Sequence, residues 1–462
     1  MQSPFDISAD LDTPVSAYIK LKPFEPCFLL ESVEGGERLG RYSFLGLGAS
    51  VTLELTASNL RIDGNNVDRP ADGAAWLALL RGVLDSSPDL APAIKGLPFS
   101  GGLVGAAGYD LVRYFERLPQ NHSEPRSLPQ AALVAPKSLL IFDHLTRRAA
   151  LLHSGSESDR QALRRDIIAT LRGGIPVQEQ IKTKFSPAQA SLSPAEFMTA
   201  VARCKEHITA GDIYQIVLSV RFDGTSNLDP FQCYRALRLL NPSPYMYFFE
   251  LGELSVAGSS PEALVRLEGD HASLRPIAGT RPRGASEETD LALERELLAD
   301  PKENAEHVML VDLARNDLGR VAQAGSVHVE PYRNIERYSH VMHIVSGVQG
   351  TLDASKDAFD LFAAAFPAGT LVGAPKVRAM ELIAEFEPVG RGLYGGTVGY
   401  FSKNGNMDQA ITIRTMVFNG DEYSFQAGAG IVADSDPERE HQEVMAKSAI
   451  LRRALEIAEE GL

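Results

Sequence analysis

The sequence places closely spaced glutamates just after two predicted helix starts. An aspartate followed by a proline is typical of a helix N-terminus, and this pair occurs at positions 300–301 and 436–437. Side chains three or four residues apart on a helix share a face. The two helices would therefore each present acids on one face, namely Glu303 with Glu306, and Glu440 with Glu443 and Lys447.

These glutamates admit two interpretations. Acids in the first turns of a helix offset its dipole while remaining solvated, and Glu303 stands where its carboxylate could reach back to the helix cap. Glu306 and Glu443 lie deeper in their helices, so they are the better candidates for metal ligands if the two helices meet. Oxygen ligands without cysteine favour a hard ion such as Mg²⁺, which keeps open positions for water and a substrate carboxylate.

Three other residues could take part in chemistry. Arg414 lies in the strand-like run 410–418, where a guanidinium among apolar residues suits a carboxylate of a ligand or of this chain. His343 is compatible with a satisfied core histidine or with a proton carrier. Glu262 follows a strand-like run, where it would cap a turn, face solvent, or have a raised pKa and act as a general acid.

Three glycine-rich segments, 276–284, 393–400 and 426–433, combine glycine with a cation or a hydroxyl. Such segments can hold a small anion against backbone N–H groups, or they can mark bulges and close backbone packing. No dinucleotide or P-loop fingerprint occurs, which argues against NAD and ATP as ligands.

Composition indicates a globular protein and limits its partners. The 462 residues are 44% hydrophobic and 23% charged, and the formal net charge of −15 disfavours nucleic acid as a partner. The three cysteines, Cys27, Cys204 and Cys233, are too widely spaced to suggest zinc or a disulfide scaffold. The acidic N-terminus and the absence of a long apolar stretch predict a cytoplasmic protein without membrane contact.

The order of the predicted elements favours an α+β layered sandwich. Residues 1–175 form a mixed N-terminal region, and residues 172–193 are expected to be a linker or a surface crossing. Ser193, Pro194 and Glu196 predict a helix start, and Gly211 its end. The C-terminal region, residues 190–462, alternates strands and helices, with a hairpin turn at Asn404-Gly405. The two regions are expected to pack as one compact unit.

These segments resemble motifs of the chorismate-utilising enzymes, a family that includes anthranilate, aminodeoxychorismate, isochorismate and salicylate synthases, and they occur in the same order along the chain. The resemblance runs from about Ser193 to Leu451 and rests on the motifs PIAGTRPRG, DPKENAEHVMLVDLARNDLGRV, SHVMHIVSG, FPAGTLVGAPKVRAMELI, YGGTVGYF, AITIRT and AGAGIVADSDPEREHQE, followed by Lys447. It implies two large, mostly antiparallel sheets packed face to face, with helices outside.

The resemblance also implies roles for residues at the matching positions. Mg²⁺ would be held through Glu306 and Glu443, with Glu303 and Glu440 beside it, and would bridge to the ring carboxylate of chorismate. Glu262 matches the general acid that protonates the C4 hydroxyl. The residues implied in holding the substrate are Thr280, Thr370, Tyr394, Arg414, Lys447 and the backbone of Gly428, Ala429 and Gly430.

Two positions distinguish branches of the family. Gln215 replaces the lysine with which water-adding members activate water, so ammonia is the expected nucleophile. Ala278 replaces the lysine that is typical of aminodeoxychorismate synthases, which disfavours that branch. Aminodeoxychorismate synthase is nevertheless the closest alternative. The expected reaction is therefore conversion of chorismate through 2-amino-2-deoxyisochorismate to anthranilate and pyruvate, the first step of tryptophan biosynthesis, with His343 matching the histidine associated with the elimination.

Two segments resemble the halves of a tryptophan feedback site, which predicts inhibition by tryptophan. They comprise Leu30, Glu31 and Ser32, and Asn241, Pro242, Ser243, Pro244, Tyr245 and Met246. No cysteine stands in a glutaminase nucleophile turn, so a separate glutamine amidotransferase subunit is expected to supply the ammonia. A non-catalytic tryptophan sensor is the remoter alternative.

Overall fold

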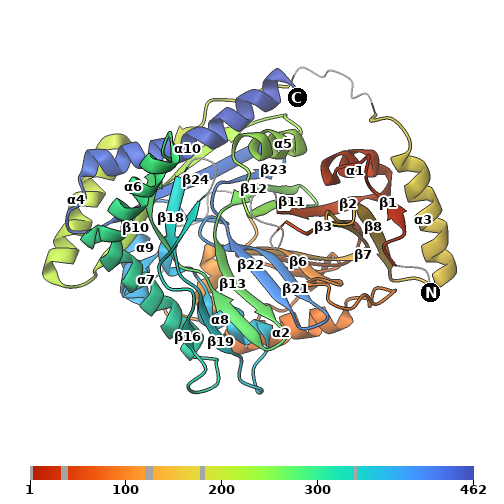
Figure 1. Cartoon of the computed structure of the whole chain (residues 1–462), viewed down its shortest axis with the longest axis horizontal. Helices are drawn as coiled ribbons and strands as arrows, with labels where there is room; N and C mark the ends of the chain where they lie inside the picture. The colour runs from red at the N-terminus through yellow and green to blue at the C-terminus, as the bar shows by residue number, and fades with distance from the viewer. Residues whose placement is uncertain (1–3, 33–39, 120–127, 177–182, 338–340) are drawn as a thin grey trace.

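Helices surround a large sheet in the computed structural model, which describes residues 4–32, 40–119, 128–176, 183–337 and 341–462 (Figure 1). The helices are α1 (Pro14–Lys20), α2 (Gly73–Ser86), α3 (Glu157–Leu171), α4 (Pro194–Ala210), α5 (Pro230–Leu240), α6 (Glu287–Ala299), α7 (Pro301–Gly319), α8 (Ala358–Ala365), α9 (Lys376–Phe386) and α10 (Pro437–Glu460), with short 3-10 turns η1 (Lys22–Phe24), η2 (Tyr109–Tyr114) and η3 (Gly369–Leu371).

The strands of the N-terminal half are β1 (Ile7–Ser8), β2 (Pro26–Glu31), β3 (Tyr42–Leu55), β4 (Leu60–Ile62), β5 (Asn65–Val67), β6 (Gly102–Ala107), β7 (Ala131–Asp143), β8 (Arg148–His153) and β9 (Gln189–Ala190). Those that follow are β10 (Gln215–Thr225), β11 (Tyr245–Leu251), β12 (Leu254–Ser260), β13 (Ala263–Glu268), β14 (His271–Leu274), β15 (Ile277–Pro282), β16 (His328–Val329), β17 (Asn334–Arg337), β18 (Val341–Val345), β19 (Val348–Thr351), β20 (Gly373–Ala374), β21 (Thr397–Ser402), β22 (Met407–Ile411), β23 (Thr415–Asn419) and β24 (Glu422–Ile431).

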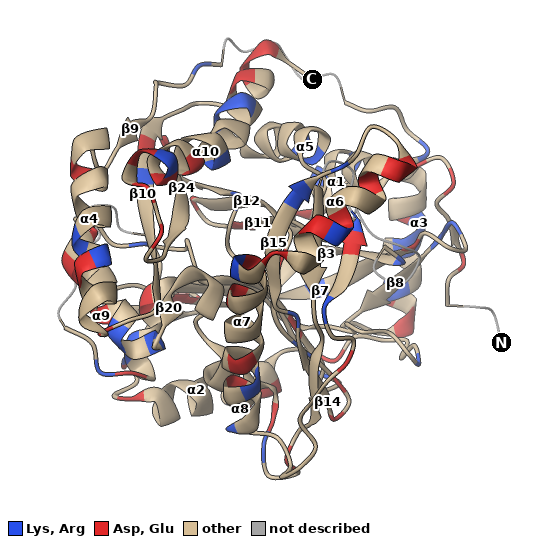
Figure 2. Cartoon of the chain, turned by 60° about the vertical axis from the view of Figure 1, so that its left-hand side comes forward, with Lys and Arg blue, Asp and Glu red and all other residues tan. Residues whose placement is uncertain are grey.

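The predicted α+β class, with a large antiparallel sheet and helices outside, is confirmed. Among the described residues, hydrogen bonding joins 21 strands into one network, so the expected sheets are continuous with each other. The three remaining strands, β15, β18 and β17, form a small separate sheet. Figures 1 and 2 show the helices around the outside, with α10 beside β24 and α7 beside β15, two of the strands that carry glycine-rich segments.

Strands of the N-terminal and C-terminal regions pair directly with each other. β2 pairs with β11, with Glu31 opposite Met246, and β6 pairs with β21. One apolar core cluster includes Trp76 and Leu133 from the N-terminal region and Phe248 and Leu451 from the C-terminal region. Removing either region would expose this shared apolar surface.

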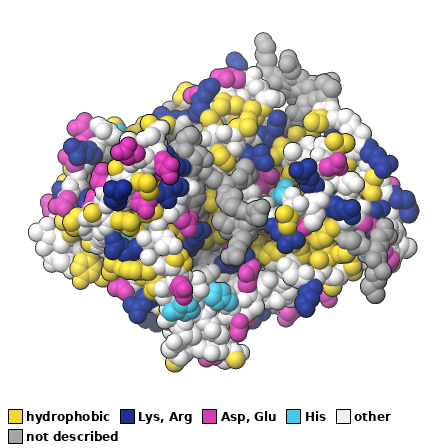
Figure 3. All heavy atoms as spheres, viewed as in Figure 1, with side chains coloured by type: hydrophobic (Ala, Val, Ile, Leu, Met, Phe, Trp, Pro, Cys, Tyr) yellow, Lys and Arg dark blue, Asp and Glu magenta, His cyan; other side chains and the backbone are white. Residues whose placement is uncertain are grey.

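The expected linker includes residues 177–182, which lie outside the described residues. On either side of it, α3 ends at Leu171 and α4 begins at Pro194. As predicted, α4 is capped by Ser193 in a capping box with Glu196 and ends at Gly211 with a left-handed φ of 85°. No described helix is long and apolar enough to cross a bilayer. Basic and acidic side chains are interspersed on the face shown in Figure 3.

Candidate active site

A cavity of about 740 Å³ collects most of the predicted site residues. Its walls come from β10, β15, β18, β24, α7, α10 and the segments that follow α5, β12 and α9. The predicted residues that line it are Gln215, Asn241, Pro242, Ser243, Pro244, Glu262, Thr280, Glu303, Glu306, His343, Thr370, Tyr394, Arg414, Gly428, Gly430, Glu440, Glu443 and Lys447.

Six predicted residues do not line this cavity, for two different reasons. Ala429 is buried and stands between Gly428 and Gly430 on β24, where alternation turns its side chain to the other face. Leu30, Glu31, Ser32, Tyr245 and Met246 belong to the β2 and β11 region, behind the loop at 241–244.

Glu262 lines the cavity together with two cations, Arg414 and Lys447. Burial raises its pKa to about 7, and the Thr370 hydroxyl, Arg414 and Lys447 limit the rise. Its backbone carbonyl accepts a hydrogen bond from the Ile411 amide, which fixes the turn after β12. A carboxyl with this pKa is about half protonated near neutral pH, so it can donate a proton to a leaving oxygen.

The glutamates of α7 and α10 line the same cavity, so the two helices meet, which is the condition that the sequence sets for a metal site. Glu306 lies 3.3 Å from the Gln215 amide nitrogen, and burial raises the pKa of its carboxyl, with Glu303 and Glu443 adding to the rise. Burial likewise raises the pKa of Glu440, and the charge of Glu443 adds to the rise. The repulsion between these carboxylates would be relieved by a cation between them.

Two of these glutamates, Glu303 and Glu443, form ion pairs with cations of the chain. Glu303 does not bond back to its cap; its carboxylate pairs with Arg281 at 2.9 Å, and Asp300 alone caps α7. Glu443 pairs with Lys447 at 2.7 Å, half exposed to the cavity. Over the described residues, no three acidic, histidine or cysteine side chains are already arranged to hold a metal ion. The arrangement fits Mg²⁺, which commonly uses one or two carboxylates and completes its shell with water and substrate.

Arg414 interrupts the strand that the sequence predicted at 410–418. β22 ends at Ile411 and β23 begins at Thr415, so the expectation of one continuous strand is wrong. Arg414 lies between them with φ of +49°, a left-handed conformation that strains a non-glycine residue. Its backbone carbonyl accepts from the Ser259 amide and its guanidinium donates to the Asn241 side chain at 3.3 Å. The strained turn aims the cation into the cavity instead of leaving it on a strand face.

The glycine strand β24 lets a tyrosine and a lysine approach its backbone. A side-chain carbon at Gly428 would lie 2.7 Å from the Tyr394 hydroxyl, so only glycine fits there. Lys447 donates to the Gly428 carbonyl at 3.0 Å. At Gly430, the same carbon would lie 2.9 Å from the Gln215 amide nitrogen. The glycines of β24 therefore allow the side chains of Tyr394 and Gln215, two predicted site residues, to pack directly against its backbone.

His343 and Thr280 come from the small sheet and face each other across paired strands. The Nδ1 atom of His343 lies 3.0 Å from both the Thr280 hydroxyl and the Gly279 carbonyl. Burial lowers the pKa of His343, which keeps the imidazole neutral and able to accept a proton.

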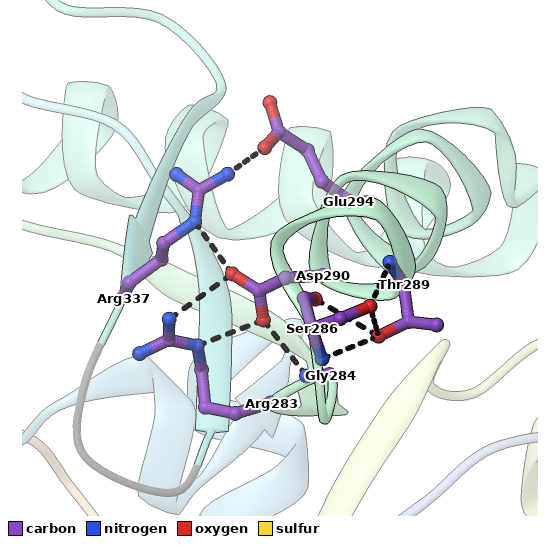
Figure 4. Close-up of polar contacts among 7 residues, drawn as sticks. All are labelled: Arg283, Gly284, Ser286, Thr289, Asp290, Glu294 and Arg337. Carbon is purple, nitrogen blue, oxygen red and sulfur yellow. Dashed lines mark hydrogen bonds and ion pairs between the residues drawn. The ribbon is translucent and has the colours of Figure 1, made fainter.

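Asp290 fastens this small sheet to helix α6 (Figure 4). Its carboxylate accepts from Arg283 at 2.9 Å, from the Gly284 amide at 2.8 Å and from Arg337 at 3.0 Å, and Arg337 also pairs with Glu294. These contacts hold the pKa of Asp290 well below its usual range. Arg283 follows β15 and Arg337 ends β17, so one carboxylate holds two edges of the sheet that carries Thr280 and His343.

The two predicted tryptophan segments are neighbours. Glu31 on β2 binds Tyr234 and Arg238 of α5, the helix that ends immediately before Asn241. Asn241 donates to Ser259 at 2.9 Å and accepts from Arg414.

The buried Ser32 hydroxyl has no hydrogen-bond partner among the described residues, and Tyr245 donates to the partly buried Asp408 at 3.0 Å. Sequence reasoning missed Ser259 and Asp408, because a lone serine or aspartate in a strand carries no distinguishing pattern.

Known proteins resemble this chain in sequence and in structure. The profile of the chorismate binding enzymes matches residues 25–453. Anthranilate synthase component 1 of Thermus thermophilus is 46% identical over 460 residues, covering 98% of this chain and 97% of that protein. Anthranilate synthase component I from Streptococcus pneumoniae superposes with a TM-score of 0.80 at 35% identity, covering 89% of this chain and 92% of the other. The menaquinone-specific isochorismate synthase of Escherichia coli shares the fold, with a TM-score of 0.70 at 22% identity, over 96% of this chain and 92% of the other.

Proposed function

The chain belongs to the family of chorismate binding enzymes, and we propose that it converts chorismate and ammonia to anthranilate and pyruvate in the cytoplasm. The observation that carries this proposal is that Glu262, whose pKa burial raises to about 7, lines the same cavity as Arg414 and Lys447. A dianionic substrate needs such cations, and a hydroxyl leaving group needs such an acid.

In the first step, Glu262 donates its proton to the C4 hydroxyl, the C4–O bond breaks and water leaves. Ammonia forms a new bond at C2 while the ring double bonds shift, which gives 2-amino-2-deoxyisochorismate. Arg414, Lys447 and Tyr394 hold the carboxylates during this step, with the backbone at Gly428 to Gly430. Gln215 offers no base to activate water, which favours ammonia over water at C2.

In the second step, the C2 proton and the enolpyruvyl group leave, and the ring becomes aromatic as pyruvate is released. Burial lowers the pKa of His343, which favours the neutral imidazole, and this residue lines the cavity. We therefore propose that His343 accepts the C2 proton. Glu306 and Glu443 would hold Mg²⁺, with Glu303 and Glu440 beside them. When bound, this ion would supply Lewis-acid stabilisation of charge on the ring carboxylate.

A separate glutamine amidotransferase subunit would supply the ammonia. The three cysteines of the chain, Cys27, Cys204 and Cys233, are all buried, and burial raises the pKa of each thiol. A glutaminase needs an accessible thiolate, which none of these positions offers.

The decisive experiment incubates the isolated chain with chorismate, Mg²⁺ and ammonium at alkaline pH and follows anthranilate fluorescence, with parallel samples that contain EDTA or tryptophan. Anthranilate that disappears in both samples would support the proposal. An aminated, non-aromatic product would instead indicate an aminodeoxychorismate synthase, although Ala278 stands at the position of its lysine. Tryptophan binding without turnover would indicate a sensor.

We further propose that tryptophan binds between residues 30–32 of the N-terminal region and residues 241–246, and inhibits through Asn241. The Asn241→Ala variant removes the contact to Arg414. It should raise the tryptophan concentration for half inhibition at least about fivefold, the lower end of usual allosteric coupling. Initial rates at a series of tryptophan concentrations measure this.

Asn66→Ala on the exposed strand β5 provides the control, since it changes the same side chain far from the cavity lining. Unchanged inhibition in Asn241→Ala would remove Asn241 from the regulatory path.

A further inference from the structure

A buried ion pair, Arg391 with Glu387, lies directly behind the cavity wall. Both residues follow α9, and their side chains are 1% and 4% exposed. The Nε atom of Arg391 donates to Glu387 Oε2 at 2.8 Å, and Nη2 donates to Oε1 at 2.6 Å. Burying such a pair costs desolvation that offsets much of its attraction, so stability alone is a weak reason for its presence.

The same guanidinium binds two backbone carbonyls of the wall. Nη1 donates to the Leu371 carbonyl at 2.7 Å, and Nη2 donates to the Val217 carbonyl at 2.8 Å. Leu371 follows Thr370 on η3, and Val217 lies on β10 two residues after Gln215. Both Leu371 and Val217 line the cavity. Arg391 therefore fixes the distance between two wall segments that are far apart in the chain.

The carboxylate of Glu387 extends the network to a third segment. Its Oε1 atom accepts from the Ser219 amide at 2.9 Å and from the Ser219 hydroxyl at 2.7 Å. That hydroxyl accepts in turn from the Gln426 amide nitrogen at 2.8 Å. Gln426 lines the cavity on β24, two residues before Gly428.

A fourth contact is with the Tyr394 ring. The guanidinium carbon of Arg391 lies 5.7 Å from the centre of this ring and 4.8 Å from that of Tyr109. The Tyr394 amide donates to the Arg391 carbonyl at 3.0 Å. The Tyr394 hydroxyl reaches the space over Gly428, where a side-chain carbon would collide with it. The position of this hydroxyl thus depends on Arg391.

From these contacts, we propose that the Arg391–Glu387 pair is a positioning element that sets the shape of the anion-binding wall formed by Val217, Leu371, Tyr394 and Gln426. The identity of the ligand as chorismate rests on the proposed function. The pair touches no part of the cavity interior itself and acts through the segments it holds. Tyr394 is the wall residue that the proposed function assigns to a substrate carboxylate, and it makes this contact throughout the reaction, so displacement of the wall weakens binding of the ground state and the transition state alike.

The test compares Arg391→Lys and Ser219→Ala with the wild type in the full chain. Lysine keeps the charge but lacks the planar guanidinium fork, so it cannot donate hydrogen bonds to the Glu387 carboxylate and to both backbone carbonyls at the same time. We expect Arg391→Lys to raise KM for chorismate about tenfold or more with kcat within about threefold, since small displacements of binding groups carry large costs. Ser219→Ala leaves the pair intact and should raise KM about threefold.

Leu151→Ala on β8 is the control for general loss of stability, because Leu151 is buried and does not line the cavity. It should lower the thermal midpoint at least as much as Ser219→Ala while KM stays unchanged. If Arg391→Lys does not fold, the KM of Ser219→Ala for chorismate tests the proposal by itself. A KM within twofold of wild type in the folded variants would overturn the positioning role.

Calorimetric titration with chorismate separates this proposal from the proposed function. A wild type that binds chorismate without forming anthranilate would refute the function, while weaker binding by Arg391→Lys would still support positioning. Equal binding by wild type and both variants would refute positioning, whatever product the enzyme forms.

Discussion

Replacing Glu262 with glutamine is expected to lower kcat for anthranilate formation about 10³-fold, within the range of about 10²–10⁴-fold that general acids contribute. Glutamine keeps the size of the side chain but has no proton to give to the C4 oxygen. Chorismate should still bind, because Arg414 and Lys447 remain in the cavity. Anthranilate fluorescence gives the rate, and titration with chorismate gives the affinity.

Glu253→Gln is the matched control for this prediction. Glu253 lies in the turn before β12, the strand that leads to Glu262, but it is exposed and does not line the cavity. This variant should keep wild-type kcat. Retention of more than a tenth of the wild-type rate in Glu262→Gln would exclude Glu262 as the acid.

The same substitution should change how stability depends on pH. Because burial raises the pKa of Glu262 from 4.5 to about 7, the native state keeps a proton that the unfolded chain has released. The resulting stabilisation is full below pH 4.5 and is lost as pH rises through about 7; at about 1.4 kcal/mol per pKa unit it is at most about 3 kcal/mol.

Glutamine does not titrate, so Glu262→Gln should gain stability relative to wild type between about pH 5 and pH 8. Urea unfolding at both pH values measures this difference. If the difference in stability between Glu262→Gln and wild type is the same at pH 5 and pH 8, Glu262 is already ionised in the native state at both pH values.

Glu306→Gln should lower kcat/KM at least about 100-fold, since loss of residues that merely support metal ligands already costs about 10–100-fold. Glutamine removes the charge that would hold Mg²⁺ and keeps the contact geometry to Gln215. Two measurements test the prediction independently. Anthranilate formation reports activity, and thermal unfolding with and without Mg²⁺ reports binding, because a ligand of the native state raises its stability.

Two substitutions serve as comparisons. Glu438→Gln, in the exposed first turn of α10, should behave like wild type in both measurements. Glu303→Gln should have a smaller effect than Glu306→Gln, because Arg281 already neutralises Glu303. A thermal shift with Mg²⁺ that is as large in Glu306→Gln as in wild type would remove Glu306 from the metal site.

Local signals in the sequence predicted several elements correctly. The aspartate-proline pairs at 300–301 and 436–437 begin α7 and α10, with the aspartate as N-cap in both. The Asn404-Gly405 turn lies in the hairpin between β21 and β22, with Gly405 at a φ of +87°. These features depend on backbone conformation within a few residues, which side-chain chemistry determines locally.

Contacts between distant segments could not be predicted in this way. Arg414 interrupts an apparently regular strand run because its strained turn is held by Ser259, about 150 positions earlier in the chain. The pairing of Glu303 with Arg281 instead of its cap likewise depends on how β15 packs beside α7. No periodicity records which remote donor reaches a given carbonyl or carboxylate.

The sequence by itself determined the helix starts, the α+β class, the family resemblance and the set of residue types available for acid catalysis and anion binding. Only the tertiary structure decided that most of these residues share one cavity, that burial raises the pKa of Glu262 to about 7, and that Arg391 and Glu387 hydrogen-bond to the wall segments from behind. The physical reason is that burial, desolvation and hydrogen-bond partnership are properties of the packed chain, whereas capping and turn preferences belong to short segments.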